Sequence, residues 1–98
     1  MQKQEDNSMF LRVVTPDSPA SEVYCDSIRL TLRDDREGRG GGAYGIHKGH
    51  AKAVMALDEG PVFALSKGEK VFSCVISGGF AKVSDNVVTV VAENLINR

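Results

Sequence analysis

The segment Ile28-Arg29-Leu30-Thr31-Leu32-Arg33 alternates apolar and polar side chains at every position. A period of two places the apolar side chains on one face of an extended strand and the polar side chains on the other. The segment therefore predicts a β-strand with one face on a core and one face in water, which makes it the starting point for the fold.

Similar short segments lie on both sides of this strand, separated by turn residues. Before it, the strand Met9–Thr15 ends at Pro16, and Pro19 predicts an irregular stretch ahead of a short strand at 22–25. After it, strands are expected at 43–46, 52–57, 62–65, 70–76, 80–83 and 87–92. About nine to ten short strands at regular spacing predict an all-β fold, an antiparallel β-sandwich or flattened barrel.

Turn chemistry supports this arrangement. Ser66-Lys67-Gly68-Glu69 and Ser84-Asp85-Asn86 each indicate a hairpin, and Gly78-Gly79 indicates a bulge or tight corner. The segment 52–57 is apolar on both faces, which predicts a central or doubly covered strand, with a short helix as the alternative.

The length of 98 residues allows one domain. We expect a disordered tail at 1–8, the β-domain at 9–94 and a C-terminal end at 95–98. From the polar N-terminus we expect no signal peptide, and no apolar run reaches the ~18 residues of a membrane span. Cys25 and Cys74 indicate two buried thiols in a reducing, cytosol-like compartment, although a bridge between them stays open.

The charge and the composition exclude several classes of partner. The formal net charge is −1, from 12 basic and 13 acidic residues, so the chain has no general field that attracts DNA, RNA or anionic lipid. There is no Trp, and 6% of the residues are aromatic, which leaves little for a base-stacking platform.

Two motifs suggest chemistry that their context does not support. The segment 40–45 matches G-x-G-x-x-G, but Ile46-His47-Lys48-Gly49 follows where a dinucleotide site needs a helix. His47 and His50 would need converging Cys or carboxylate partners to hold zinc, so a structural role is expected, with His50 packed and hydrogen-bonded. We therefore predict no catalytic, cofactor or metal site and no enzymatic activity.

Two features are compatible with binding to another protein. The residues 34–42 mix both charge signs with glycine, which indicates either a solvated surface loop or a docking loop. The apolar inventory exceeds what one side of a thin sheet needs, which indicates either a two-sheet core or a protein-binding patch. The side chains concerned are Val54, Met55, Leu57, Val62, Phe63 and Phe80.

Several segments together resemble a known family. They are LRVVTP at 11–16, GAYGIHKGHA at 42–51, ALDEGPV at 56–62, SGGFAKV at 77–83 and NVVTVVAE at 86–93. In this order and spacing, over residues 9–94, they resemble the N-terminal β-sandwich domain of the epsilon subunit of F-type ATP synthases.

The resemblance implies a central-stalk rotor subunit of a proton-translocating synthase. Such a domain packs on the gamma subunit, stands on the c-ring and couples ring rotation to gamma, without a cofactor. It implies a bacterial protein at the cytoplasmic face of the cell membrane, touching the membrane only through the complex.

The matching motifs also imply roles for individual residues. Contact with gamma is expected at His50, Ala51, Val54 and Met55. Contact with the c-ring is expected at Gly41, Gly42, Ala43 and Tyr44. Glycines that permit positive φ or close approach are expected at Gly45, Gly49, Gly78 and Gly79.

Three departures from the family pattern qualify these roles. Lys48 replaces the usual proline, His47 replaces a hydrophobic residue, and Ala43 replaces an acidic residue. The segment 28–46 is longer than usual, and we hypothesise that its charged loop replaces the lost ring contact. The chain ends before the family's helical hairpin, which implies coupling without self-inhibition. The alternatives are a free-standing paralogue that acts as an adaptor, or a small metal-dependent enzyme using both histidines and a cysteine.

Overall fold

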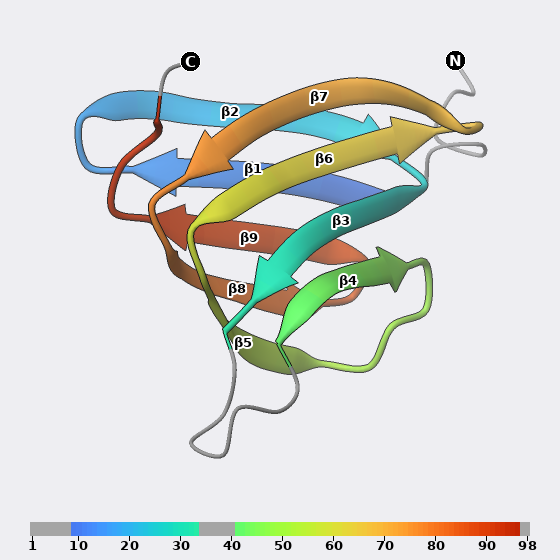
Figure 1. Ribbon diagram of the computed structural model, residues 1–98. Coiled ribbons are helices and arrows are strands. Elements are labelled where there is room, and N and C mark those ends of the chain that lie inside the picture. The colour runs from blue at the N-terminus through green and yellow to red at the C-terminus, as the bar shows by residue number, and fades with distance from the viewer. Residues whose placement is uncertain (1–8, 34–40, 97–98) are drawn as a thin grey trace.

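The computed structural model describes residues 9–33 and 41–96. These residues form nine strands and no helix (Figure 1). The strands are β1 (Met9–Thr15), β2 (Ser18–Cys25), β3 (Ser27–Leu32), β4 (Gly42–His47), β5 (Ala53–Leu57), β6 (Gly60–Ser66), β7 (Glu69–Ile76), β8 (Gly79–Ser84) and β9 (Val87–Ala92).

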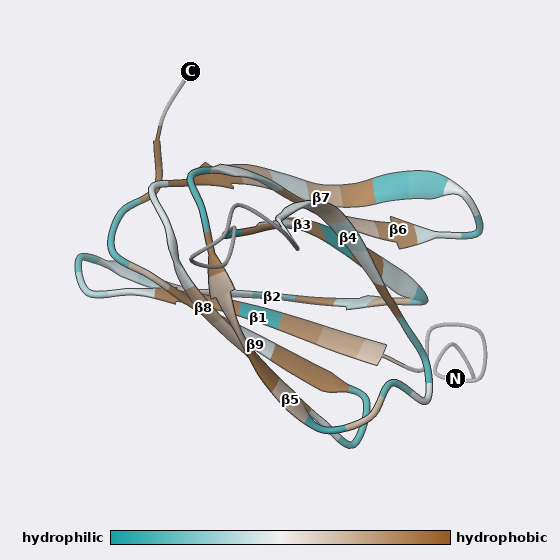
Figure 2. Cartoon of the chain, turned by 60° about the horizontal axis from the view of Figure 1, so that its bottom comes forward, coloured by the Kyte–Doolittle hydropathy of each residue, from teal (hydrophilic) through white to brown (hydrophobic). Residues whose placement is uncertain are grey.

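The strands form two layers of one continuous sheet. The first layer has the order β2-β1-β9-β8-β5, and the second contains β3, β6 and β7, with β4 paired to β3. The layers join where Leu32 of β3 pairs with Leu57 of β5 and the Arg33 amide donates to the Ala56 carbonyl at 3.0 Å. Figure 2 shows the second layer above the first. The predicted all-β sandwich or flattened barrel is confirmed.

The core lies between the two layers and follows the alternation seen in the sequence. Along β1, the side chains of Met9, Leu11 and Val13 are buried, while those between them are partly or fully exposed. The opposite layer contributes Ile28, Leu30, Ile46, Val62, Ala64 and Ile76 to the same cluster. Burial of one face of every strand is the main stabilising contribution that this sequence supplies.

Two hairpins have the turn type that their residues favour. Lys67 and Gly68 have φ of 53° and 82°, and Asp85 and Asn86 have φ of 53° and 64°. Two successive left-handed residues form the type I′ turn, whose twist matches that of antiparallel strands. Both hairpins were predicted from the turn residues.

Three expectations about strands hold only in part. Strand β1 pairs with β9 in parallel, with Phe10 opposite Val87, so the sandwich is not wholly antiparallel. Pro19 lies within β2, and the expected irregularity falls inside this strand: Ser21 pairs with Val13 and Ser18 with Thr15, so the register shifts at Pro19 and Ala20. A missing N–H is tolerated there because β2 is an edge strand. Segment 53–57 is a strand, as expected, and not the alternative short helix, but it is not covered on both faces, since Val54 is 70% exposed.

The structure answers the expectation for the cysteines but not those for the chain ends and the segment 34–40. Cys25 is buried, Cys74 is half-buried, and both thiols are free, so they form no bridge. The expected tail at 1–8, the expected loop at 34–40 and the last residues 97–98 lie outside the described ranges. Within residues 9–33 and 41–96, no helix is long and apolar enough to cross a membrane.

Candidate protein-docking surface

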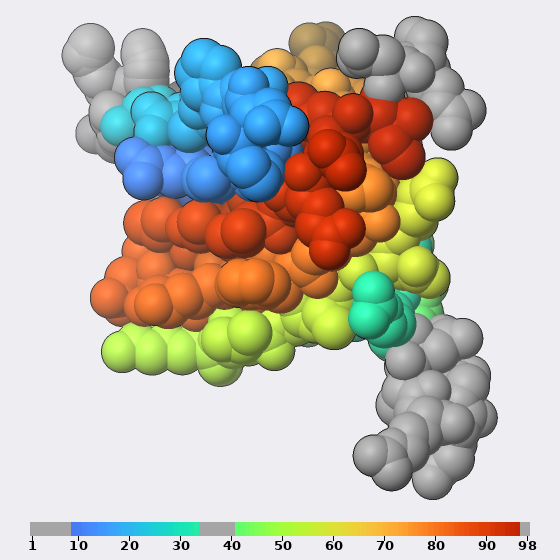
Figure 3. Space-filling view, turned by 90° about the vertical axis from the view of Figure 1, so that its left-hand side faces the viewer, coloured from blue at the N-terminus to red at the C-terminus, as the bar shows by residue number. Residues whose placement is uncertain are grey.

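The outer face of the first layer carries a row of apolar side chains. The register places Val14 of β1 opposite Val91 of β9, Val91 opposite Phe80 of β8, and Phe80 opposite Ala56 of β5. All four alternate with core residues, so they point away from the core. Phe80 is 47% exposed. Figure 3 shows β1 in blue, β9 in red-orange, β8 in orange and β5 in yellow-green stacked in this order.

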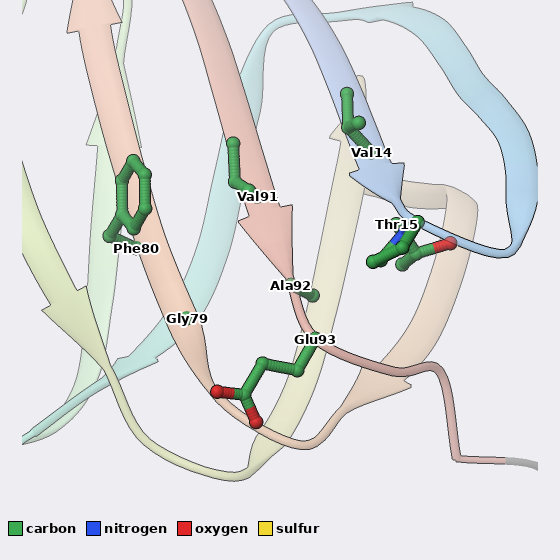
Figure 4. A pocket seen from close by; sticks show the side chains of 8 residues that line it. Val14, Thr15, Gly79, Phe80, Val91, Ala92 and Glu93 are labelled. Atoms are coloured by element: carbon green, nitrogen blue, oxygen red, sulfur yellow. The ribbon is translucent and has the colours of Figure 1, made fainter.

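This row ends in a groove of about 360 Å³. Figure 4 shows Val14, Val91 and Phe80 projecting from three adjacent strands, with Glu93 at one end of the groove. The full lining is Val14, Thr15, Pro16, Gly79, Phe80, Val91, Ala92 and Glu93. The groove is therefore an apolar surface with an acidic rim, which is the composition of a protein-docking site.

Polar side chains bound this apolar row on the same face. The next row, two residues away on each strand, contains Arg12, Thr89 and Lys82 and ends on β5 with the apolar Val54, which lies opposite Lys82. Arg12 forms a salt bridge of 2.7 Å with Glu22 on the neighbouring β2. A polar rim beside an apolar centre is the usual anatomy of a protein interface.

The residues predicted to contact gamma do not share one surface. Val54 is 70% exposed on the outer face of β5, whereas Met55 is half-buried and packs against the core. The two side chains point to opposite faces because they are neighbours on one strand. Ala51 is exposed, and His50 is partly buried in the turn before β5.

The residues predicted to contact the c-ring lie at and before the start of β4. Gly41, Gly42 and Ala43 are exposed, and Tyr44 is partly buried. The Tyr44 hydroxyl lies 2.9 Å from His50 Nε2, and the two rings meet edge to face. The two predicted contact regions therefore touch each other through this pair.

His50 is fully engaged by the protein. Its Nδ1 lies 2.7 Å from the Ala51 carbonyl oxygen, which only accepts, so Nδ1–H donates there. In the neutral imidazole, Nε2 then accepts from the Tyr44 hydroxyl. Neither ring nitrogen is left for a metal, and the described residues contain no group of three or more His, Cys, Asp or Glu that could hold a metal ion.

The cysteines are poorly suited to nucleophilic chemistry. Burial raises the pKa of the Cys25 thiol to about 11, and the nearby Asp26 carboxylate adds to the rise. Burial also raises the pKa of the Cys74 thiol. Both therefore remain thiols near neutral pH, and a thiol is a weak nucleophile compared with a thiolate.

The four glycines singled out by the sequence differ in conformation. Gly49, Gly78 and Gly79 have positive φ, of 85°, 124° and 146°. Gly45 does not, and a Cβ there would meet only the His47 ring at an ordinary 3.6 Å. Nothing in the structure therefore requires glycine at position 45.

Four residues of the groove and of the β4–β5 turn contact were not predicted as site residues from the sequence: Val14, Val91, Glu93 and Asn86. The alternation along β1 and β9 could have indicated the two valines, because both stand at positions that alternate with buried residues and therefore face outward. The sequence identified Asn86 only as a turn residue. Its hydrogen bond from the Gly49 amide, and the place of Glu93 at the groove, depend on strands that are distant in the chain.

Comparisons with known proteins agree with this architecture. The chain is 38% identical over 91 residues to the ATP synthase epsilon chain of Nitratidesulfovibrio vulgaris (strain DSM 19637 / Miyazaki F), covering 91% of this chain and 60% of that relative. It is 30% identical over 87 residues to the ATP synthase epsilon chain of Pelotomaculum thermopropionicum (strain DSM 13744 / JCM 10971 / SI), covering 89% and 59%. The chain thus spans about 60% of the length of these curated relatives.

Solved structures show the same fold. A chain in the cryo-EM structure of Euglena gracilis mitochondrial ATP synthase, OSCP/F1/c-ring, superposes with a TM-score of 0.66 at 26% identity, covering 90% of this chain and 52% of that one. A chain from the Tetrahymena thermophila enzyme, at 17% identity and a TM-score of 0.63, supports the fold alone. Residues 8–98 match the family described as "ATP synthase, Delta/Epsilon chain, beta-sandwich domain", and the chain belongs to this family.

Proposed function

We propose that this chain is a central-stalk rotor subunit of a proton-translocating ATP synthase, which couples rotation of the c-ring to the gamma subunit. The observation that carries the proposal is the outward-facing apolar row of half-buried Val14 and Val91 and exposed Phe80, with its groove, in a domain of this family. An apolar surface of this kind on a small domain is most simply explained by a protein that covers it.

The family supports a mechanical role. Its members are non-catalytic subunits of ATP synthase, which agrees with the prediction that this chain is not an enzyme. The Euglena gracilis chain with the same fold belongs to a structure that contains F1 and the c-ring. On this basis the protein would sit peripherally at the cytoplasmic face of a bacterial membrane, held there by the complex.

We assign the gamma-binding surface to the outer face of the first layer. It contains Val54 from the predicted set and adds the groove residues Val14, Phe80 and Val91. We leave Met55 out of the proposed surface because its side chain packs against the core. The c-ring would be contacted by the exposed residues 41–43 at the start of β4.

Co-purification with the gamma subunit of the same organism tests the proposal. A stable complex should bury on the order of 1,600 Å². Phe80→Asp should weaken the complex by about 30-fold, equal to about 2 kcal/mol, because it places an unpaired charge in an apolar interface. Thermal unfolding of the free variant should change little, because Phe80 is 47% exposed.

The matched control is Val71→Asp. Val71 is 46% exposed but lies on β7, in the second layer. It should leave gamma binding unchanged. Failure of the wild-type chain to bind gamma would reject the proposed function, and equal effects of the two substitutions would reject the assigned surface.

A further inference from the structure

The turn between β4 and β5 is fixed by one hydrogen bond of its own and by contacts with two other segments. The His50 amide donates to the His47 carbonyl at 3.1 Å, which closes the turn itself. The Tyr44 hydroxyl reaches back from β4 to His50 Nε2 at 2.9 Å. The Gly49 amide donates to the Asn86 side-chain oxygen at 2.8 Å, across 37 positions of sequence.

Asn86 is suited to this contact by its own conformation. It is the second residue of the β8–β9 turn and has φ of 64°. Asparagine adopts the left-handed region more readily than most residues. This conformation directs its carbonyl oxygen to the Phe10 amide of β1 at 3.0 Å, while its side chain accepts from Gly49.

One residue therefore joins three parts of the domain: β1, the β8–β9 turn and the β4–β5 turn. Gly49 has φ of 85° and exposes its amide in the turn, so without Asn86 this N–H would bond to water. The Tyr44–His50 pair continues the connection into β4. The network links the strand assigned to the c-ring with the layer assigned to gamma.

We propose that Asn86 is a positioning residue that holds the β4–β5 turn against the first layer, so that force applied at β4 reaches the gamma-binding face without deforming the turn. This inference rests on the proposed function. It assigns a role to a residue that contacts neither surface itself.

The first test measures amide hydrogen exchange at Gly49 in the free chain. Asn86→Gly keeps the left-handed backbone but removes the acceptor, and should accelerate exchange about fivefold, equal to about 1 kcal/mol. Asn86→Asp keeps an acceptor oxygen and should retain protection. Asp85→Gly loosens the same turn at its other left-handed residue, φ 53°, and should leave Gly49 exchange unchanged.

The second test measures coupling in the complete synthase, as proton pumping per ATP hydrolysed in inverted vesicles. The wild-type chain must first restore coupling to vesicles from a strain that lacks it, and failure of that step would reject the proposed function alone. With that step met, Asn86→Gly should lower the ratio at least twofold while gamma binding is unchanged, and Asn86→Asp should rescue it.

Two results would overturn the inference and leave the proposed function intact. One is normal coupling with Asn86→Gly. The other is an Asn86→Gly chain that is unfolded or no longer binds gamma, which would assign Asn86 to stability and not to positioning.

Discussion

Gly79 of β8 lies directly against the backbone of Val91 on β9. A Cβ built on Gly79 would overlap the Val91 carbonyl oxygen and lie 2.9 Å from the Ala92 Cα. Gly79 also has φ of 146°, a conformation that L side chains rarely adopt. The close approach brings β8 and β9 together at the base of the apolar groove, where both Gly79 and Val91 line the wall.

Gly79→Ala should lower the free energy of unfolding by about 3 kcal/mol or more, because the clash is with backbone that has no rotamer to change. Urea unfolding followed by circular dichroism measures the change. Gly68→Ala is the control, since Gly68 has φ of 82° but open space around a Cβ. It should cost about 1–2 kcal/mol, for backbone strain alone. Equal costs would mean that the contact with Val91 contributes nothing.

Tyr44→Phe should lower the free energy of unfolding by about 1 kcal/mol, the contribution of one partly buried hydrogen bond. The edge-to-face contact of the rings, at 5.9 Å, is kept in this variant. Tyr24→Phe is the matched control, because Tyr24 is 52% exposed. Removing its hydroxyl leaves the contact between its ring and that of Phe10 in place. Denaturant unfolding of both variants gives the comparison, and identical stability would show that water replaces the Tyr44 bond without loss.

Cys25 should make stability depend on pH in the alkaline range. The unfolded thiol loses its proton near pH 8.5, whereas the folded thiol has a pKa of about 11. Between these values the folded state binds more protons than the unfolded state. The contribution of the Cys25 thiol to the free energy of unfolding is therefore complete below about pH 8.5 and decreases as the pH rises to about 11. Urea unfolding across this range should show a steeper fall for wild type than for Cys25→Ala. If the free energy of unfolding fell equally with pH in wild type and in Cys25→Ala, the raised pKa of Cys25 would be refuted.

The Arg12–Glu22 pair should contribute little to stability, despite its short distance of 2.7 Å. Both side chains are more than two-fifths exposed, so water competes for the charges. Arg12→Ala should cost less than about 1 kcal/mol at low salt, and less still at about 1 M salt. A double-mutant cycle with Glu22→Ala isolates the pair, and a coupling energy that is large and independent of salt would contradict this view.

Much of the fold could be predicted from local sequence. The alternation from Ile28 to Arg33 gave β3, and the turn residues at Lys67-Gly68 and Asp85-Asn86 gave two hairpins. The packed, hydrogen-bonded role of His50 was also expected, because a histidine between small residues in a turn has backbone groups near its ring. These features depend on residues close together in the chain, where side-chain direction and turn geometry follow from a few torsion angles.

The candidate surfaces could not be predicted in this way. The groove joins Val14 to Phe80 and Val91, and the turn contact joins Gly49 to Asn86, in each case across tens of residues. Neighbouring Val54 and Met55 were grouped by sequence but separated by the two faces of their strand.

The sequence by itself determined that this protein consists of short strands with one apolar face, and where most of its turns fall. Only the tertiary structure decided that β1 and β9 pair in parallel, and therefore which apolar side chains stay outside the core. The physical reason is that alternation sets the two faces of each strand locally, whereas the choice of partner strand depends on packing the whole core at once.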